Sequence, residues 1–263
     1  MGVSGRWGDL RARTLSAVGM VVAGGVLIWV GGPWFAALAV LVSGLMIWEL
    51  AMMTAPGKAR EARLLGLLGA AALALVFYAH LPFVLVVLVL PSLLGLATAR
   101  KDRLIFALYA LAVMLAGYGM VAFRAGLGLE MILWIVAVVV ASDIAGYFAG
   151  RTIGGPKFWP RVSPKKTWSG TVAGWLLAVV VGWGFVAAGQ AGGALIALSP
   201  LVAFAGQMGD IAESWIKRRC GVKDSSNLIP GHGGVLDRFD ALLGAVVVLL
   251  GVAIFMPLPQ VGS

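Results

Sequence analysis

The sequence has little charge, one cysteine and no familiar nucleotide-binding motif. Only 12% of its 263 residues are Lys, Arg, Asp or Glu, whereas about a quarter of an ordinary soluble domain is charged. The single cysteine, Cys220, excludes an intrachain disulfide. The motifs GxxxxGK(S/T) and GxGxxG are absent, which argues against P-loop and Rossmann-type nucleotide binding. Apolar residues instead make up 61% of the chain and its mean hydropathy is +0.99, as in a polytopic membrane protein.

Long apolar runs fill most of the chain and predict its fold. Runs of roughly 17 to 22 residues recur between short polar stretches, and a helix of that length crosses about 30 Å of hydrocarbon. We predict an all-α, polytopic integral membrane protein of about nine transmembrane helices, in one helical membrane domain over residues 1–263. The division at His80, Leu81 and Pro82 is the least clear, so a count of eight stays open. The predicted helices are 15–32, 33–53, 64–80, 81–97, 104–123, 130–149, 169–189, 192–213 and 241–258.

The basic residues predict the orientation of the chain, because Lys and Arg in short loops favour the cytoplasmic side. With nine helices and a cytoplasmic N-terminus, the cytoplasmic segments carry 19 of the 20 Lys and Arg residues, and only Arg124 falls outside them. Topology and attraction to anionic membrane lipids therefore explain most of the net charge of +9. We expect no nucleic-acid partner.

Acidic side chains within apolar runs are costly in lipid, so each one is a candidate for a functional site. Asp143, in "SDIAGYFAGR", lies in the sixth predicted helix, where a structural hydrogen bond between helices is an equally good interpretation. Glu49 ends the second predicted helix near the inner interface. We interpret Glu49 as the partner of a loop arginine and leave it outside the site.

Two pairs of carboxylates end one predicted helix and open the next. Asp210 and Glu213 stand three residues apart on the eighth helix, and Asp237 and Asp240 have the same spacing at the start of the ninth, so each pair shares a face. If these helices are neighbours, the oxygens converge on a hard cation such as Mg2+, and zinc is a poor fit without further Cys or His ligands. The alternative is that the two aspartates cap the ninth helix. Ser214 and Lys217 continue the neighbourhood of the first pair.

Two polar loops on the predicted cytoplasmic side carry groups that suit phosphate. The first, "KDSSNLIPGHGG", combines Lys223 and two serines with His232 and glycine amides, although such a turn taken alone is more often only a turn. The glycines are Gly231, Gly233 and Gly234. Positive-inside anchoring explains much of the second loop, "GRTIGGPKFWPRVSPKKTWSG", whose basic residues are Arg151, Lys157, Arg161, Lys165 and Lys166. Carboxylates suited to Mg2+ beside loops suited to phosphate indicate phosphoryl or nucleotidyl transfer to a lipid phosphate.

At these residues the sequence resembles the phosphatidate cytidylyltransferase family, also called CDP-diacylglycerol synthases. The upstream "SDIAGYFAGR" and "SPKKTWSG" also look like motifs of that family, so the resemblance is sharp over about 142–241, the expected catalytic half. Ser226 and Ala241 depart from it, since many members have Gly and Ser there. The matching residues are Ser214, Lys217, Arg218, Lys223, Asp224, Pro230, His232, Gly233, Gly234, Asp237, Arg238 and Asp240.

The resemblance implies that CTP and phosphatidate react to CDP-diacylglycerol and pyrophosphate with Mg2+ present, and leaves a second cation open. It implies a multi-pass protein of the bacterial inner (plasma) membrane with its site facing the cytoplasm, and it is compatible with a homodimer. Asp210 and Asp237 would be the leading metal ligands, with Asp240 and Glu213 as third ligand or close neighbour. The residues expected around the phosphates are Ser214, Lys217, Arg218, Lys223, Asp224 and Arg238. Those expected to hold CTP are His232, Gly231, Gly233 and Gly234. Those expected beside the lipid headgroup or nucleotide are Asp143, Lys165 and Lys166.

Three alternatives remain at the level of the sequence. A transporter also places acids and cations in helices, but it would not need the glycine-rich loop. A CTP-dependent lipid kinase would use a similar site and release CDP instead of pyrophosphate. A purely structural membrane protein would tolerate substitutions in both loops.

Overall fold

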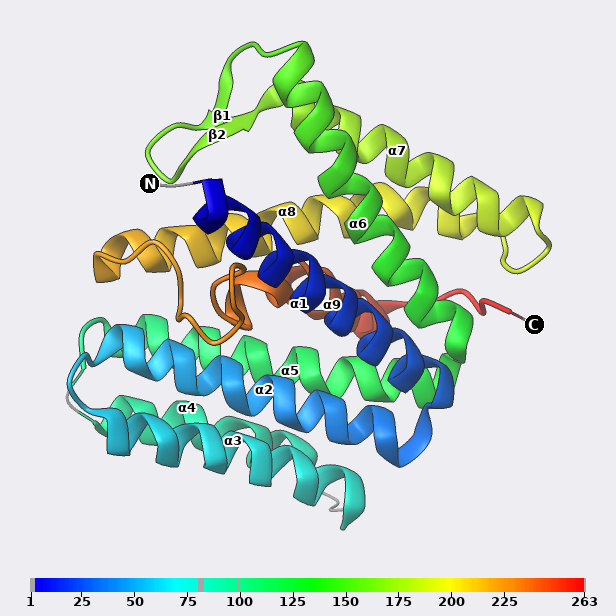
Figure 1. The fold of residues 1–263 in the computed structure, drawn as a ribbon. Coiled ribbons are helices and arrows are strands. Elements are labelled where there is room, and N and C mark those ends of the chain that lie inside the picture. Colours follow the sequence, from blue (N-terminus) through cyan, green and yellow to red (C-terminus); the bar gives the residue numbers. More distant parts are fainter. Residues whose placement is uncertain (1–2, 80–82, 99, 263) are drawn as a thin grey trace. The chain divides into compact units, whose positions relative to one another are not determined.

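The computed structural model describes residues 3–79, 83–98 and 100–262, with side chains from residue 14 onward, and Figure 1 shows its ribbon. This part of the chain forms nine helices and a short hairpin of two strands. The helices are α1 (Val3–Val30), α2 (Gly32–Thr54), α3 (Ala59–Tyr78), α4 (Val84–Ala97), α5 (Arg103–Leu127), α6 (Leu129–Thr152), α7 (Trp168–Ala187), α8 (Ala194–Cys220) and α9 (Leu236–Phe255). The strands are β1 (Lys157–Trp159) and β2 (Ser163–Thr167).

The helices confirm the predicted all-α fold of a multi-pass membrane protein. Seven of those described are long and apolar enough to cross a membrane, while the apolar part of α1 (Thr14–Val30) and the helix α4 are shorter. The predicted break at His80, Leu81 and Pro82 lies outside the described residues. Because α3 ends at Tyr78 and α4 begins at Val84, the two are separate helices, which favours nine over eight.

The chain divides into two compact units, each built from segments distant in the sequence. Unit 1 comprises Met1–Gly117 and Arg219–Phe239, and unit 2 comprises Tyr118–Arg218 and Asp240–Ser263. In unit 1, α2 packs along α3 through glycines whose lack of a side chain permits close approach: a Cβ on Gly66 would lie 2.8 Å from the carbonyl oxygen of Gly44. In unit 2, α6 and α7 approach similarly at Gly146 and Gly170. One helical membrane domain over 1–263 stays a prediction.

The β1–β2 hairpin was not predicted, because its segment contains Gly, Pro and adjacent lysines, which are uncommon in strands. The two strands pair antiparallel, with Lys157 opposite Thr167. Thr167 then caps α7, since its side-chain oxygen accepts a hydrogen bond from the Gly170 amide at 3.2 Å. The ring of Phe158 packs edge-on against Trp168, with centroids 4.6 Å apart. The second basic loop is therefore an ordered hairpin that leads directly into a capped helix.

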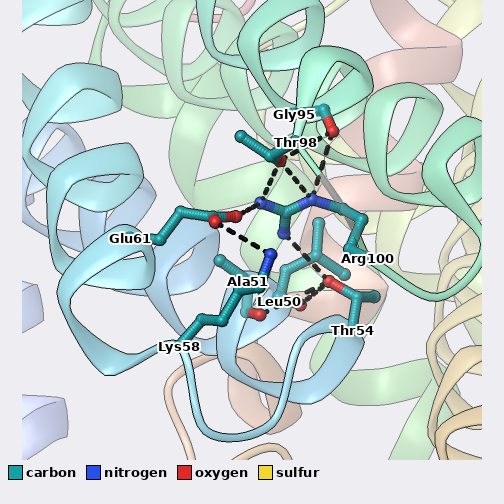
Figure 2. Close-up of polar contacts among 8 residues, drawn as sticks. All are labelled: Leu50, Ala51, Thr54, Lys58, Glu61, Gly95, Thr98 and Arg100. Atoms are coloured by element: carbon teal, nitrogen blue, oxygen red, sulfur yellow. Dashed lines mark hydrogen bonds and ion pairs between the residues drawn. The ribbon is translucent and has the colours of Figure 1, made fainter.

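Arg100 joins the ends of several helices of unit 1 (Figure 2). Its guanidinium is fully buried and forms an ion pair with Glu61, near the start of α3. It also donates to the carbonyl oxygen of Gly95 in α4 at 3.1 Å and to the hydroxyl of Thr54 in α2 at 3.2 Å, and it lies 4.0 Å above the ring of Phe106 in α5. Arginine suits this position because its guanidinium is planar and carries several hydrogen-bond donors. In the sequence Arg100 is one of the basic residues that indicate the cytoplasmic side, and in the structure it also links the ends of these helices.

Replacing Arg100 by lysine is expected to lower the unfolding temperature of the purified protein by about 5 °C or more. Lysine keeps the charge but cannot reach Gly95, Thr54 and Glu61 together from one planar group. A thermal melt followed by tryptophan fluorescence tests this, with Arg60→Lys as the control, because Arg60 is an exposed arginine near the start of α3. Equal melting temperatures for the two variants would contradict the structural role of Arg100.

Candidate functional site

Three carboxylates of unit 2 converge within the helical region. Asp210 and Glu213 of α8 and Asp240 of α9 each offer one oxygen, and these oxygens lie within 4.8 Å of one another. Glu213 is fully buried and Asp240 is 9% exposed. The spacing of three residues places the first two on one face of α8, as the sequence predicted. We call these three residues the carboxylate cluster.

Small residues explain how α8 and α9 come close enough to form the carboxylate cluster. A Cβ on Gly209 would lie 2.2 Å from the carbonyl oxygen of Asp240, and a Cβ on Gly244 would lie 2.3 Å from the carbonyl oxygen of Ala205. Real Cβ atoms are not found at such distances, so the two backbones meet only because both positions are glycine. The residue before Asp210 and the backbone of Asp240 itself therefore form the contact that brings the carboxylates together.

Two lysines balance part of the charge of the carboxylate cluster. The ammonium of Lys166, in β2, lies 2.6 Å from Asp210 Oδ2. The ammonium of Lys217 lies 2.5 Å from Glu213 Oε2, one turn along α8, and the Ser214 hydroxyl is 3.4 Å from Asp210 Oδ1. The hairpin thus delivers Lys166 to the acids of α8, which the sequence did not show.

Asp143 adds a fourth acid to this neighbourhood of unit 2. It lies in α6, close enough to Lys166 and Asp210 for electrostatic interaction. Lys165, next to Lys166 along β2, is exposed instead. The structure therefore brings together, within unit 2, Asp143, Lys166, Asp210, Glu213, Ser214, Lys217 and Asp240; Arg218, also of this unit, is exposed.

The loop between α8 and α9, residues 221–235, belongs to unit 1 and is the orange segment of Figure 1. Its glycine-rich tip is a tight turn, in which the Ile229 amide donates to the carbonyl of Gly233 at 2.8 Å and the His232 amide donates back to Ile229 at 2.9 Å. Gly231 and Gly233 have φ values of 76° and 81°, which favour glycine. His232 Nδ1 lies 2.9 Å from the Ser16 hydroxyl of α1. Lys223, Asp224 and Arg238 are exposed, as suits groups that meet a soluble ligand.

Asp237 organises the 221–235 loop from the first turn of α9. Its Oδ2 accepts hydrogen bonds from the amide and the hydroxyl of Ser225, both at 2.9 Å, and from the Gly234 amide at 2.7 Å. A carboxylate that reaches back to an amide three residues earlier is a helix-capping contact, the alternative that the sequence left open. The role of Asp237 as a metal ligand stays a prediction.

Glu49 is the residue that the sequence interpretation missed. The expected arginine partner is wrong for the part of the chain that the structure describes. Glu49 is fully buried in α2 and accepts hydrogen bonds from the Ser226 hydroxyl and from two backbone amides, at the end of the 221–235 loop and the start of α9, while the Ser225 hydroxyl lies 3.2 Å away. The only signal in the sequence was the acid itself, within an apolar helix.

Arg219, one of the basic residues that follow Asp210 and Glu213 in α8, has a structural partner. It donates two hydrogen bonds to Asp102 and thereby lowers the pKa of that carboxyl.

Comparison with known proteins identifies the family. The profile of the cytidylyltransferase family matches residues 11–256, which is nearly the whole chain. This chain belongs to the cytidylyltransferase family. A phosphatidate cytidylyltransferase of Brucella suis is 48% identical over 124 residues, which are 46% of this chain and 46% of the relative. Those of Helicobacter pylori and Bacillus subtilis are 46% and 41% identical over 119 residues, 44% of each chain.

The alignments with these relatives therefore span less than half of their length and of this chain. In this member of the cytidylyltransferase family, the carboxylate cluster fits a hard divalent cation by the chemistry of its donors, because all three are carboxylate oxygens and two of the residues are buried. Asp210, Glu213 and Asp240 could hold such an ion. Lys166 and Lys217 at its edge offer cationic groups of the kind that bind phosphate oxygens.

Proposed function

We propose that this chain is a phosphatidate cytidylyltransferase, which transfers the cytidylyl group of CTP to phosphatidate and releases pyrophosphate. The observation that carries the proposal is the carboxylate cluster with its two lysines, held between membrane helices of a cytidylyltransferase. Both substrates are anionic phosphates and one is a lipid, so a reaction between them needs acids for a cation, cations for phosphate and access from the bilayer.

In the proposed reaction an oxygen of the phosphatidate phosphate attacks the α-phosphorus of CTP. A bond from that oxygen to the α-phosphorus forms as the bond from the α-phosphorus to the bridging oxygen breaks, and pyrophosphate leaves with the electron pair. A Mg2+ held by Asp210, Glu213 and Asp240 would supply charge neutralisation for the polyphosphate. Lys166 and Lys217 hold phosphate oxygens in place. In this proposal the glycine amides and His232 of the 221–235 loop, with Lys223 and Arg238, bind the CTP phosphates.

The remaining sequence predictions complete the proposal. Arg218 and Asp224 contribute at the edge of the phosphate site, and Asp143 and Lys165 border the lipid headgroup or the nucleotide. The proposed location is the bacterial inner membrane, and the positive-inside distribution of Lys and Arg supports an orientation in which the site faces the cytoplasm. A homodimer and a second cation are compatible with this function.

Labelled CTP tests the proposed function and separates it from the kinase and transporter alternatives. The purified protein, in detergent with phosphatidate and Mg2+, is given CTP labelled either at the α-phosphate or at the γ-phosphate. A cytidylyltransferase moves only the α-label into lipid and releases the γ-label as pyrophosphate. A CTP-dependent lipid kinase would move only the γ-label into lipid, and a transporter would move neither label. A folded protein that gives either of these two results would contradict the proposal.

A further inference from the structure

Glu49 has a place in the fold that its sequence context does not explain. It is a carboxylate with no exposed surface inside α2, a helix of apolar side chains. A buried carboxylate is strongly unfavourable unless hydrogen bonds replace the lost water. The groups that supply these bonds lie more than 170 residues later in the sequence, in the 221–235 loop and at the start of α9.

The two oxygens of Glu49 each join residues 225–226 of the loop to residues 235–236, where the loop meets α9. Oε1 accepts from the Ser226 hydroxyl at 2.5 Å and from the Val235 amide at 2.9 Å. Oε2 accepts from the Leu236 amide at 2.7 Å and lies 3.2 Å from the Ser225 hydroxyl. The Leu236 amide opens α9, where the first amides of a helix lack partners within it and favour negative charge. One side chain therefore closes residues 225–236 into a loop against α2.

The neighbouring backbone is shaped to admit this carboxylate. A Cβ on Gly234 would lie 2.5 Å from Glu49 Oε1 and 2.0 Å from the Ser225 hydroxyl, so this position has room only for glycine. Asp237 Oδ2 holds the same stretch from the other side, through the amides of Ser225 and Gly234. The glycine-rich turn with His232 lies between the two anchored ends, and its conformation depends on both carboxylates.

We propose that Glu49 is the positioning residue of the 221–235 loop: it fixes residues 225–226 and 235–236 against α2, so that the amides between them and His232 are already arranged to bind the triphosphate of a nucleotide. This rests on the proposed function for the identity of the nucleotide, but the anchoring itself does not. Glu49 acts through the loop and does not touch the substrate. Because a prearranged loop avoids the entropic cost of ordering on binding, Glu49 acts mainly on nucleotide affinity.

Glutamine at position 49 distinguishes anchoring from mere filling of space. Glutamine has the shape of glutamate, but one of its two terminal groups is an NH2 donor. Each oxygen of Glu49 faces a backbone amide, Val235 at one and Leu236 at the other, so either orientation of a glutamine side chain sets a donor against a donor. Glu49→Gln therefore breaks the anchor without creating a cavity. Glu61→Gln is the matched control, because Glu61 lies in unit 1 but pairs with Arg100 and Lys58 instead of loop amides.

Hydrogen exchange and steady-state kinetics on the full chain form the test. In Glu49→Gln the amides of residues 225–236 are expected to exchange about tenfold faster than in the wild type, while Glu61→Gln keeps the wild-type rate there. With Mg2+ and phosphatidate, the KM for CTP is expected to rise about tenfold in Glu49→Gln with a smaller change in kcat. A merely structural role would instead lower the folded fraction, and so the apparent kcat, at an unchanged KM.

Ser226→Gly gives a second, milder variant in case Glu49→Gln fails to fold. It removes the hydroxyl that donates to Glu49 Oε1, and faster exchange of residues 225–236 with a smaller rise in KM is expected. Wild-type exchange in either folded variant, or faster exchange with an unchanged KM for CTP, would overturn the proposal. If the wild type forms no CDP-diacylglycerol, hydrogen exchange still tests whether Glu49 anchors the loop. Protection of residues 225–236 from exchange by CTP, in the presence of Mg2+, then replaces the kinetic measurement.

Discussion

Asp240→Asn is expected to reduce cytidylyl transfer about 10²- to 10³-fold, because it removes a negative charge from the carboxylate cluster without changing the shape of the side chain. Asp240 is buried, and one of its oxygens lies within 4.8 Å of one oxygen each of Asp210 and Glu213, so solvent cannot replace the lost charge. The product to measure is CDP-diacylglycerol formed from α-labelled CTP. Half-maximal activity should also require a higher Mg2+ concentration.

Binding of Mn2+ without substrates, followed by electron paramagnetic resonance, separates loss of the cation from loss of folding. Asp240→Asn is expected to weaken Mn2+ binding at least about tenfold. Asp102→Asn is the control, because Asp102 is an acid of unit 1 whose partner is Arg219. An Asp240→Asn variant that keeps wild-type activity and wild-type Mn2+ binding would remove the carboxylate cluster as the cation site.

Gly209→Ala is expected to cause the largest loss of stability, with a fall in the unfolding temperature of about 5 °C or more and nearly complete loss of activity. The new methyl group would lie 2.2 Å from the carbonyl oxygen of Asp240 and 3.0 Å from the Gly244 nitrogen. Both are backbone atoms, which cannot rotate away, so α8 and α9 must separate. Because Asp210 follows Gly209 directly, the same separation disperses the carboxylate cluster.

Gly251→Ala is the matched control for this prediction. Gly251 lies in α9, as Gly244 does, but a Cβ there would have no neighbour within 4 Å. Since alanine is a better helix former than glycine, Gly251→Ala should be neutral or slightly stabilising. A Gly209→Ala protein that melts with the wild type would show that α8 and α9 do not depend on this close contact.

The helices and the carboxylate cluster could be predicted because their signals are local. A run of apolar residues predicts a membrane helix without knowledge of its neighbours, and acids three residues apart share a helix face wherever that helix lies. The contact between Asp210 and Asp240 was conditional on α8 and α9 being neighbours. The glycines at 209 and 244 provide that contact, but a chain with 37 glycines does not reveal which of them matter.

The parts that the sequence did not predict depend on partners distant in the chain. Glu49 is followed by Arg60 and Arg63 in the sequence, yet its partners are the serines and amides of residues 225–236. Lys166 was expected beside the lipid headgroup or the nucleotide, and its contact with Asp210 was not foreseen because it depends on a hairpin that the sequence does not favour. Arg219 follows the acids of α8 and pairs with Asp102. In each case an ionic group has several candidate partners of equal merit, and tertiary packing selects one.

The anchoring of the loop by Glu49 also constrains the order in which the protein is made. The donors of its hydrogen bonds follow it by 176 to 187 residues, so at about 5–20 residues per second they emerge from the ribosome roughly 10–40 seconds later. During that interval α2 carries an acid whose permanent partners do not yet exist. The first half of the protein therefore completes the hydrogen bonds of Glu49 only after residues 225–236 have been synthesised.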